Sequence, residues 1–147
     1  MTQVYVISGS RNVGKSTTIR IIYNMLLEKY KGVEFFLDSG EGKEISVIIE
    51  DVNGKKIGLE SRGDPPNKEQ AKKNKNSYRN NLKKFKKKEC DIIFCTSRTR
   101  GATVAWLKKT FKNPNPIFEL KSCSDNAGNR KNENKIFASD LIKKAGL

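Results

Sequence analysis

Histidine is absent from this chain of 147 residues, and cysteine occurs only as Cys90, Cys95 and Cys123. Without histidine, neither a histidine general base nor a Ser–His or Cys–His nucleophilic pair can operate. No two cysteines form a C-x-x-C pair, so neither structural zinc nor a disulfide framework is expected. Any catalysis must therefore use carboxylates, lysine, arginine, hydroxyl groups, a thiol or a metal ion.

Long apolar runs are also missing. No stretch reaches the roughly 20 apolar residues that a membrane-spanning helix requires, and the sequence shows no signal-peptide pattern. We therefore expect a cytoplasmic protein without a membrane partner. The length suits a single domain, residues 1–147, that is large enough to bury a hydrophobic core.

Acidic residues are scarce in the second half of the chain. Residues 1–66 hold nine basic and nine acidic side chains, whereas residues 67–147 hold twenty-one and seven, which is the whole net charge of +14. Ten basic residues lie between Lys68 and Lys88, with Glu69 as the acidic one among them. A helix over these residues would be suited to binding nucleic acid or another polyanion. The alternative is a solvated face of a protein rich in lysine and asparagine.

The most informative segment is Gly9–Ser16, which reads GSRNVGKS. It fits the pattern G-x-x-x-x-G-K-[ST]. A short apolar run, Gln3–Ser8, precedes it, and Ser16–Tyr30 follows with apolar residues spaced three and four apart. Strand, glycine-rich loop and helix form the context that a phosphate-binding loop requires. On these residues the chain resembles the P-loop NTPase superfamily.

The resemblance assigns roles within this segment. Glycine lets the backbone wrap closely around phosphate groups, and the following helix adds free N–H groups and the positive end of its dipole. Lys15 would reach the β- and γ-phosphates, the Ser16 hydroxyl would bind Mg²⁺, and Thr17 would touch the α-phosphate. The predicted nucleotide-binding residues are Gly9, Ser10, Arg11, Asn12, Val13, Gly14, Lys15, Ser16 and Thr17.

Hydrophobic patterns predict the remaining elements. Asn53-Gly54 indicates a hairpin between two of the expected strands, and Val33–Leu37 has the composition of a buried strand. The strands are expected at Val33–Leu37, Glu44–Val52, Lys55–Ser61, Asp91–Cys95 and Pro116–Ser122. The helices are expected at Lys68–Lys88, Ala102–Phe111 and, after a polar loop at Cys123–Asn134, Lys135–Gly146.

The alternation of these elements predicts the fold class. We expect an α/β protein, a three-layer α/β/α sandwich whose mostly parallel sheet contains an inserted antiparallel hairpin. This arrangement is the one that the P-loop NTPase resemblance implies. Ligands in such sheets lie at the C-terminal ends of the strands, so the loops at that edge are the ones to search.

Three carboxylates are candidate partners of the nucleotide and Mg²⁺. Asp64, in the loop after a strand, is the first choice as metal ligand and catalytic group, although capping of the next helix would also explain it. Asp38 ends a strand, where small-molecule kinases of the superfamily commonly place a carboxylate that contacts the phosphate acceptor. Glu60 begins E-S-R-G, which looks like a shifted D-x-x-G element of GTPases. Simple positions in or at the end of a strand are the alternative for these two.

Two arginines complete the candidate catalytic set. Arg98 and Arg100 lie in the loop Thr96–Gly101, directly after a buried strand. A guanidinium group binds phosphate oxygens with two parallel hydrogen bonds and would stabilise charge on a transferred phosphoryl group. A solvated basic loop is the alternative interpretation. The predicted catalytic residues are Lys15, Asp64, Arg98, Arg100 and Asp38.

The leading functional hypothesis is Mg²⁺-dependent ATP hydrolysis. ATP is favoured over GTP, because the N/T-K-x-D element with which Ras-like GTPases read guanine is absent after the corresponding strand. A kinase acting on a small molecule or nucleotide is the second hypothesis. A nucleotide-dependent switch that binds nucleic acid through Lys68–Lys88 is the third. A mechanical role would require protein partners, since motor ATPases use additional domains.

Overall fold

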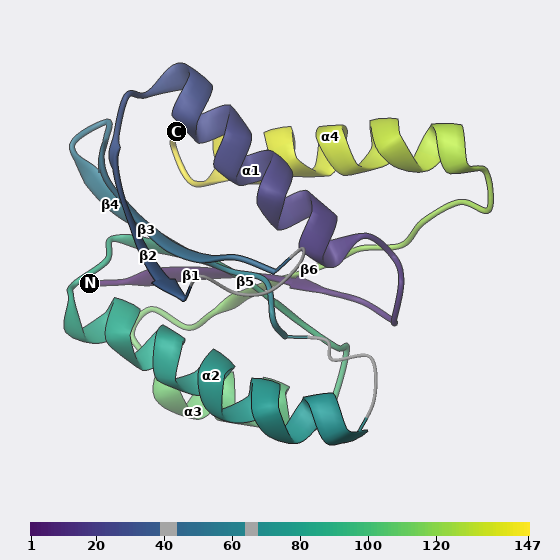
Figure 1. The fold of residues 1–147 in the computed structure, drawn as a ribbon, viewed down its shortest axis with the longest axis horizontal. Coiled ribbons are helices and arrows are strands. Elements are labelled where there is room, and N and C mark those ends of the chain that lie inside the picture. Colours follow the sequence, from purple (N-terminus) through teal and green to yellow (C-terminus); the bar gives the residue numbers. More distant parts are fainter. Residues whose placement is uncertain (39–43, 64–67) are drawn as a thin grey trace.

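A mixed β-sheet forms the centre of a computed structural model of the chain, which describes residues 1–38, 44–63 and 68–147 (Figure 1). The six strands among these residues have the order β2-β3-β4-β5-β1-β6. β4, β5, β1 and β6 are parallel, whereas β3 is antiparallel to both β2 and β4. The strands are β1 (Gln3–Ser8), β2 (Val33–Asp38), β3 (Ser46–Val52), β4 (Lys55–Glu60), β5 (Ile92–Ser97) and β6 (Ile117–Leu120).

Helices cover both faces of the sheet, so the described residues form three layers. Figure 1 shows α1 (Lys15–Lys29) and α4 (Ala127–Lys144) on one face, with α2 (Lys68–Lys87) and α3 (Ala102–Thr110) on the other. Side chains of β1 alternate between the two faces of the sheet, so this strand contributes to the hydrophobic clusters on both faces. Tyr5 and Ile7 belong to the hydrophobic cluster under α1 and α4, and Val4 and Val6 belong to the cluster under α2 and α3. The expected α/β class is confirmed.

The hairpin predicted at Asn53-Gly54 joins β3 to β4. Both turn residues have positive φ, 54° and 77°, the conformation that this pair of residues favours. The register places Ser46 opposite Glu60. The beginning of β3 therefore lies beside the end of β4, at the edge of the sheet where the parallel strands end.

The prediction that Val33–Leu37 is a buried strand was wrong. β2 is the edge strand next to β3, and Val33, Phe35 and Phe36 are 57%, 48% and 55% exposed. Apolar composition indicated a strand correctly, but composition does not say where in the sheet the strand lies. Exposure here follows from the position of β2 at the end of the strand order.

The start of the last helix was also predicted wrongly. α4 begins at Ala127, eight residues before Lys135, so most of the expected polar loop is helical. The side chain of Asn126 caps the helix by accepting hydrogen bonds from the backbone N–H groups of Gly128 (2.9 Å) and Asn129 (3.2 Å). Among the described helices, α4 included, none combines the length and apolar character needed to span a membrane.

Candidate phosphate-binding site

The segment between β1 and α1, here called the glycine loop (residues 9–14), reverses the chain through two left-handed residues. Asn12 has φ 64°, and Gly14, which precedes the first turn of α1, has φ 93°. A Cβ on Gly14 would lie 2.7 Å from Oδ1 of Asn134, and one on Gly9 would lie 2.5 Å from the carbonyl oxygen of Lys121. Glycine is thus required at Gly9 by close packing against the backbone, and at Gly14 chiefly by the positive φ.

A cavity of about 450 Å³ opens at the beginning of α1. One wall is continuous in sequence, and the other is assembled from residues that are distant in the chain. The lining residues are Arg11, Asn12, Val13, Gly14, Lys15, Ser16 and Thr17 on the first wall and Glu44, Arg130 and Asn134 on the second. Seven of the nine predicted nucleotide-binding residues therefore meet in one cavity. Ser10 lines a neighbouring cavity, and Gly9 lines neither of the two.

Lys15 is 4% exposed and is held by the carbonyl groups of the loop. Its Nζ atom donates to the carbonyl oxygens of Gly9 (2.9 Å) and Ser10 (2.7 Å). A second buried lysine, Lys121, donates from Nζ to the carbonyl oxygen of Val13 (2.8 Å), and burial lowers its pKa. Two ammonium groups thus bind loop carbonyls, and positive charge is concentrated beneath the glycine loop.

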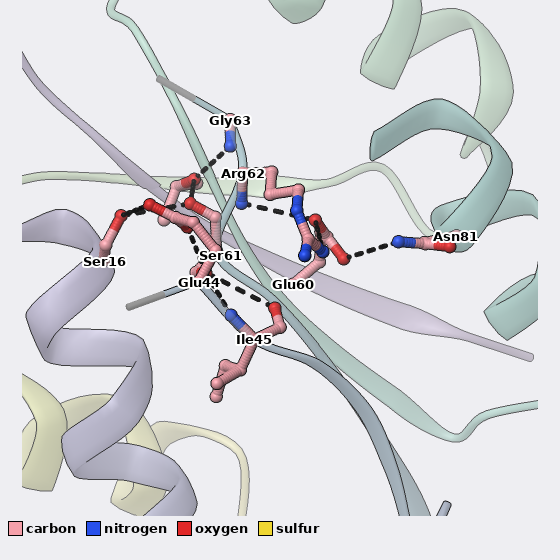
Figure 2. A network of polar contacts seen from close by, with 9 residues as sticks. Ser16, Glu44, Ile45, Glu60, Ser61, Arg62, Gly63 and Asn81 are labelled. Atoms are coloured by element: carbon pink, nitrogen blue, oxygen red, sulfur yellow. Dashed lines mark hydrogen bonds and ion pairs between the residues drawn. The ribbon is translucent and has the colours of Figure 1, made fainter. Parts of the chain in front are cut away.

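The hydroxyl of Ser16 lies at the α1 end of a polar network that joins this helix to the hairpin (Figure 2). Ser16 Oγ is 3.1 Å from the carbonyl oxygen of Ser61 and 3.5 Å from Oε1 of Glu44. The other carboxylate oxygen of Glu44 accepts a hydrogen bond from the Ser61 hydroxyl. The Ser61 hydroxyl in turn accepts from the backbone N–H of Ile45 (2.9 Å). Glu44 is therefore fixed beside Ser16.

Glu60 lies at the same end of the hairpin but is directed toward α2 (Figure 2). Its side chain is fully buried and accepts hydrogen bonds from Asn81 Nδ2 (3.1 Å) and the backbone N–H of Arg62 (3.3 Å). The Arg62 guanidinium is 3.6 Å away. Burial raises the pKa of Glu60 to about 7, although Arg62 and the hydrogen-bond donors act in the opposite direction. Glu60 does not line the cavity.

The end of β5 contacts the polar network through the hydroxyl group of Thr96. Thr96 Oγ1 donates to the carbonyl oxygen of Ser61 (3.2 Å) and accepts from the backbone N–H of Gly63 (2.9 Å). Arg98 and Arg100 are exposed and do not line the cavity. Thr99, from the same loop, lines a neighbouring cavity of about 620 Å³ that shares Arg11, Asn12 and Val13 of the glycine loop with the first cavity.

The remaining predicted carboxylates are not placed in the cavity. Asp64 lies outside the described residues, so its predicted role as metal ligand stays a prediction. Asp38 ends β2, and β3, β4 and β5 stand between that strand and β1. The side chain of Asp38 is outside the described part of the structure.

Three cavity residues were missed from the sequence: Glu44, Arg130 and Asn134. The Asn53-Gly54 hairpin was the signal for Glu44, because its register brings the start of β3 to the ligand edge. Arg130 and Asn134 are four residues apart on α4 and so share a helix face. Asn134 is 8% exposed, and its Oδ1 has no hydrogen-bond donor among the described residues. A buried acceptor in a cavity wall is suited to an O–H or N–H group of a ligand.

Comparisons with protein-family models, with curated proteins and with solved structures give no match for this chain.

Proposed function

We propose that this chain is a P-loop nucleoside triphosphatase that hydrolyses ATP with Mg²⁺. The observation that carries the proposal is the form of Gly9–Ser16. These residues make a tight left-handed turn between a buried parallel strand and a helix, and residues 11–17 line one cavity. This is the context in which a G-x-x-x-x-G-K-S segment binds a phosphate chain.

The charges of the cavity suit a triphosphate. The beginning of α1 contributes free N–H groups and the positive end of the helix dipole. Among the described residues, Arg11, Lys15 and Arg130 contribute cations, against one carboxylate, Glu44. The unsatisfied Oδ1 of Asn134 would accept a hydrogen bond from a ribose hydroxyl or a base amino group. A nucleotide offers both the anion and the donor that this cavity lacks.

The donor set also fits Mg²⁺, a hard cation that takes oxygen ligands. The Ser16 hydroxyl and the Glu44 carboxylate lie together, so Glu44 joins Ser16 and Asp64 as a candidate for holding the ion. When held there, Mg²⁺ would neutralise charge on the phosphate oxygens. Ser61 holds the Glu44 carboxylate in place, and Lys15 would exchange its loop carbonyl partners for phosphate oxygens. Arg98 and Arg100 remain predicted contributors from the β5 loop.

Substitution of Lys15 tests the proposal. Lys15→Ala should weaken ATP affinity about 100-fold, because charge-assisted hydrogen bonds to the phosphates are lost. Titration calorimetry with Mg²⁺–ATP and Mg²⁺–GTP measures the effect and the base preference together. Lys31→Ala, at an exposed lysine beyond α1, is the matched control. Unchanged affinity in a folded Lys15→Ala protein would refute the proposal.

The reaction itself is tested by phosphate release. Wild-type protein with Mg²⁺–ATP and no added acceptor should release inorganic phosphate steadily, and Lys15→Ala should abolish the release. Phosphate release that requires an added small molecule or nucleotide would instead identify a kinase. Nucleotide binding without turnover would identify a switch.

A further inference from the structure

The surface formed by α2 and α3 is strongly basic. The two helices lie on the same side of the sheet (Figure 1). We call the exposed lysines of this surface the basic face; its members among the described side chains are Lys83, Lys84, Lys86, Lys87, Lys88, Lys108, Lys109 and Lys112. Residues 77–88 and 102–112 contain no acidic residue at all. The excess positive charge in the second half of the chain is thus gathered largely on one side of the molecule.

The opposite side of the sheet is different. On α1 and α4, basic residues alternate with Glu28, Glu133 and Asp140, and Lys144 Nζ lies 2.7 Å from Oε1 of Glu119. No ion pair between described residues uses a lysine of the basic face. Glu89 and Asp91, just beyond α2, line a cavity with Lys86, Lys109 and Lys112 and offset only part of this charge. The remaining like charges on the two helices repel one another, and a bound polyanion would relieve that repulsion.

The two helices hold this surface in a fixed arrangement. Lys86 Nζ donates to the carbonyl oxygen of Thr110 (2.9 Å) and lies 5.8 Å from the centre of the Phe111 ring. Nearer the other end of α2, the rings of Tyr78 and Trp106 are 6.4 Å apart, and the Arg79 guanidinium lies 5.3 Å from the Trp106 ring. The lysines of α2 and α3 would therefore meet a ligand as one surface.

The chemistry of the surface selects the type of polyanion. Tyr78, Leu82 and Phe85 of α2 are buried against the sheet, and none of the exposed large apolar side chains of the described residues belongs to α2 or α3. A membrane-binding helix needs apolar groups to insert, so an anionic bilayer fits poorly. Base stacking is disfavoured too, because the aromatic rings are buried or covered by Arg79. Contacts to a phosphate backbone need only the lysines.

We propose that the basic face binds the phosphate backbone of nucleic acid without sequence preference. This interaction is separate from the nucleotide cavity, which lies at the start of α1 near the opposite layer of helices. It does not depend on the proposed hydrolysis. Lys15→Ala should keep its nucleic-acid affinity, so the two proposals can fail independently.

Fluorescence anisotropy with a labelled duplex of about 20 base pairs, measured from about 50 to 200 mM salt, tests the proposal. The triple variant Lys83→Gln, Lys84→Gln and Lys87→Gln removes three exposed charges and keeps helix propensity. The matched control is Lys31→Gln, Lys135→Gln and Lys143→Gln, which removes the same charge from exposed sites away from the basic face. Two duplexes of unrelated sequence are compared.

The expected result is a steep salt dependence for the wild type, equal for both duplexes. The triple variant should bind about 100-fold more weakly at about 50 mM salt, with the slope of log affinity against log salt reduced by about three, so that the difference nearly disappears at about 200 mM. The control should stay within about two-fold of the wild type, since its lysines make no backbone contact. Equal weakening in both variants, or no wild-type binding at low salt, would overturn the proposal. Tighter retention by anionic phospholipid vesicles than by the duplex would also overturn it.

Discussion

Two glutamates at the same end of one hairpin have opposite surroundings. Glu44 precedes β3 and lies in the wall of a cavity, with its carboxylate beside the Ser16 hydroxyl. Glu60 ends β4, is fully buried and is bound by Asn81 of α2 and by Arg62. Figure 2 shows the two carboxylates directed toward different helices. One lines the cavity of the proposed phosphate site, and the other is buried among protein groups.

Ser61, which follows Glu60 in the chain and contacts Glu44, shows how the difference arises. Ser61 follows Glu60 directly, so its side chain points to the opposite face of the sheet, as alternate residues of a strand do. Its hydroxyl donates to Glu44, and its carbonyl accepts from Ser16 and Thr96. Glu60 therefore lies in the layer under α2, whereas Ser61 holds Glu44 near α1. Substitution of each glutamate should therefore change a different property.

The largest effect is expected from Glu60→Gln, on the pH dependence of stability. The pKa of Glu60 is about 7 in the folded protein, against 4.5 for an unperturbed carboxyl group. Folding therefore favours the protonated form. The contribution of the protonated Glu60 to the free energy of unfolding is fully present below pH 4.5. It is lost as the pH rises toward 7, by about 3 kcal/mol in total. Glutamine resembles the protonated acid, so the variant should lack this loss.

Urea unfolding of wild type and Glu60→Gln at several pH values across this window measures the difference. Because other groups titrate as well, the relevant quantity is the gap between the two proteins, which should widen as the pH rises. A constant gap would show that Glu60 is ionised throughout. A large loss of ATP hydrolysis in Glu60→Gln would contradict the structural role assigned to this residue.

The next effect is expected from Glu44→Gln, on catalysis. The substitution removes the carboxylate charge beside Ser16, where the proposed function places Mg²⁺, so the hydrolysis rate should fall about 100-fold. Stability should change little, since the side chain is only partly buried. The measurement is steady-state phosphate release over a range of Mg²⁺ concentrations. An increased Mg²⁺ requirement would connect the loss to the metal.

Glu50→Gln is the matched control for Glu44→Gln. Glu50 lies on β3 of the same hairpin, pairs with Lys56 at 3.6 Å and is outside the cavity. Its substitution should leave hydrolysis within about two-fold of the wild type, as expected for an exposed ion pair. If Glu44→Gln behaved like this control, Asp64 would become the remaining candidate carboxylate for the metal.

The contrast between the two glutamates also shows what could be predicted from the sequence. The glycine loop could be located because its residues are contiguous and its geometry is local: a strand, two left-handed residues and a helix. The hairpin was equally local, because Asn53-Gly54 alone indicates the turn. Glu60 stands in a motif-like sequence, yet β4 is buried on both faces and alternation along the strand turns Glu60 toward α2. A motif of a few letters does not reveal which face of a sheet a residue occupies.

The second wall of the cavity could not be predicted in the same way. Glu44 is brought to the cavity by the pairing of Ser46 with Glu60, and this strand register is a property of the folded sheet that the sequence does not state. Arg130 and Asn134 reach it because α4 starts early, at a cap formed by Asn126. The first two turns of α4 contain mainly polar residues, so hydrophobic periodicity does not reveal them. The exposure of β2 was missed because strand order cannot be deduced from the apolar composition of a single strand.

The smallest effect is expected from Asn81→Leu. Asn81 is 4% exposed, and its Nδ2 donates to the ionised Glu60 carboxylate at 3.1 Å, which lowers the pKa of Glu60. Leucine fills a similar volume without the donor, so the pKa should rise further and the variant should lose about 1 kcal/mol of stability above pH 7. Below pH 4.5 the loss should be smaller, because the carboxyl is then protonated.

Urea unfolding of the single variants and of the double variant with Glu60→Gln measures the coupling between Asn81 and Glu60, which should disappear at low pH. A coupling that did not depend on pH would mean that Asn81 acts through packing, and the contrast between an ionisable structural glutamate and a ligand-facing one would then rest on Glu44 alone.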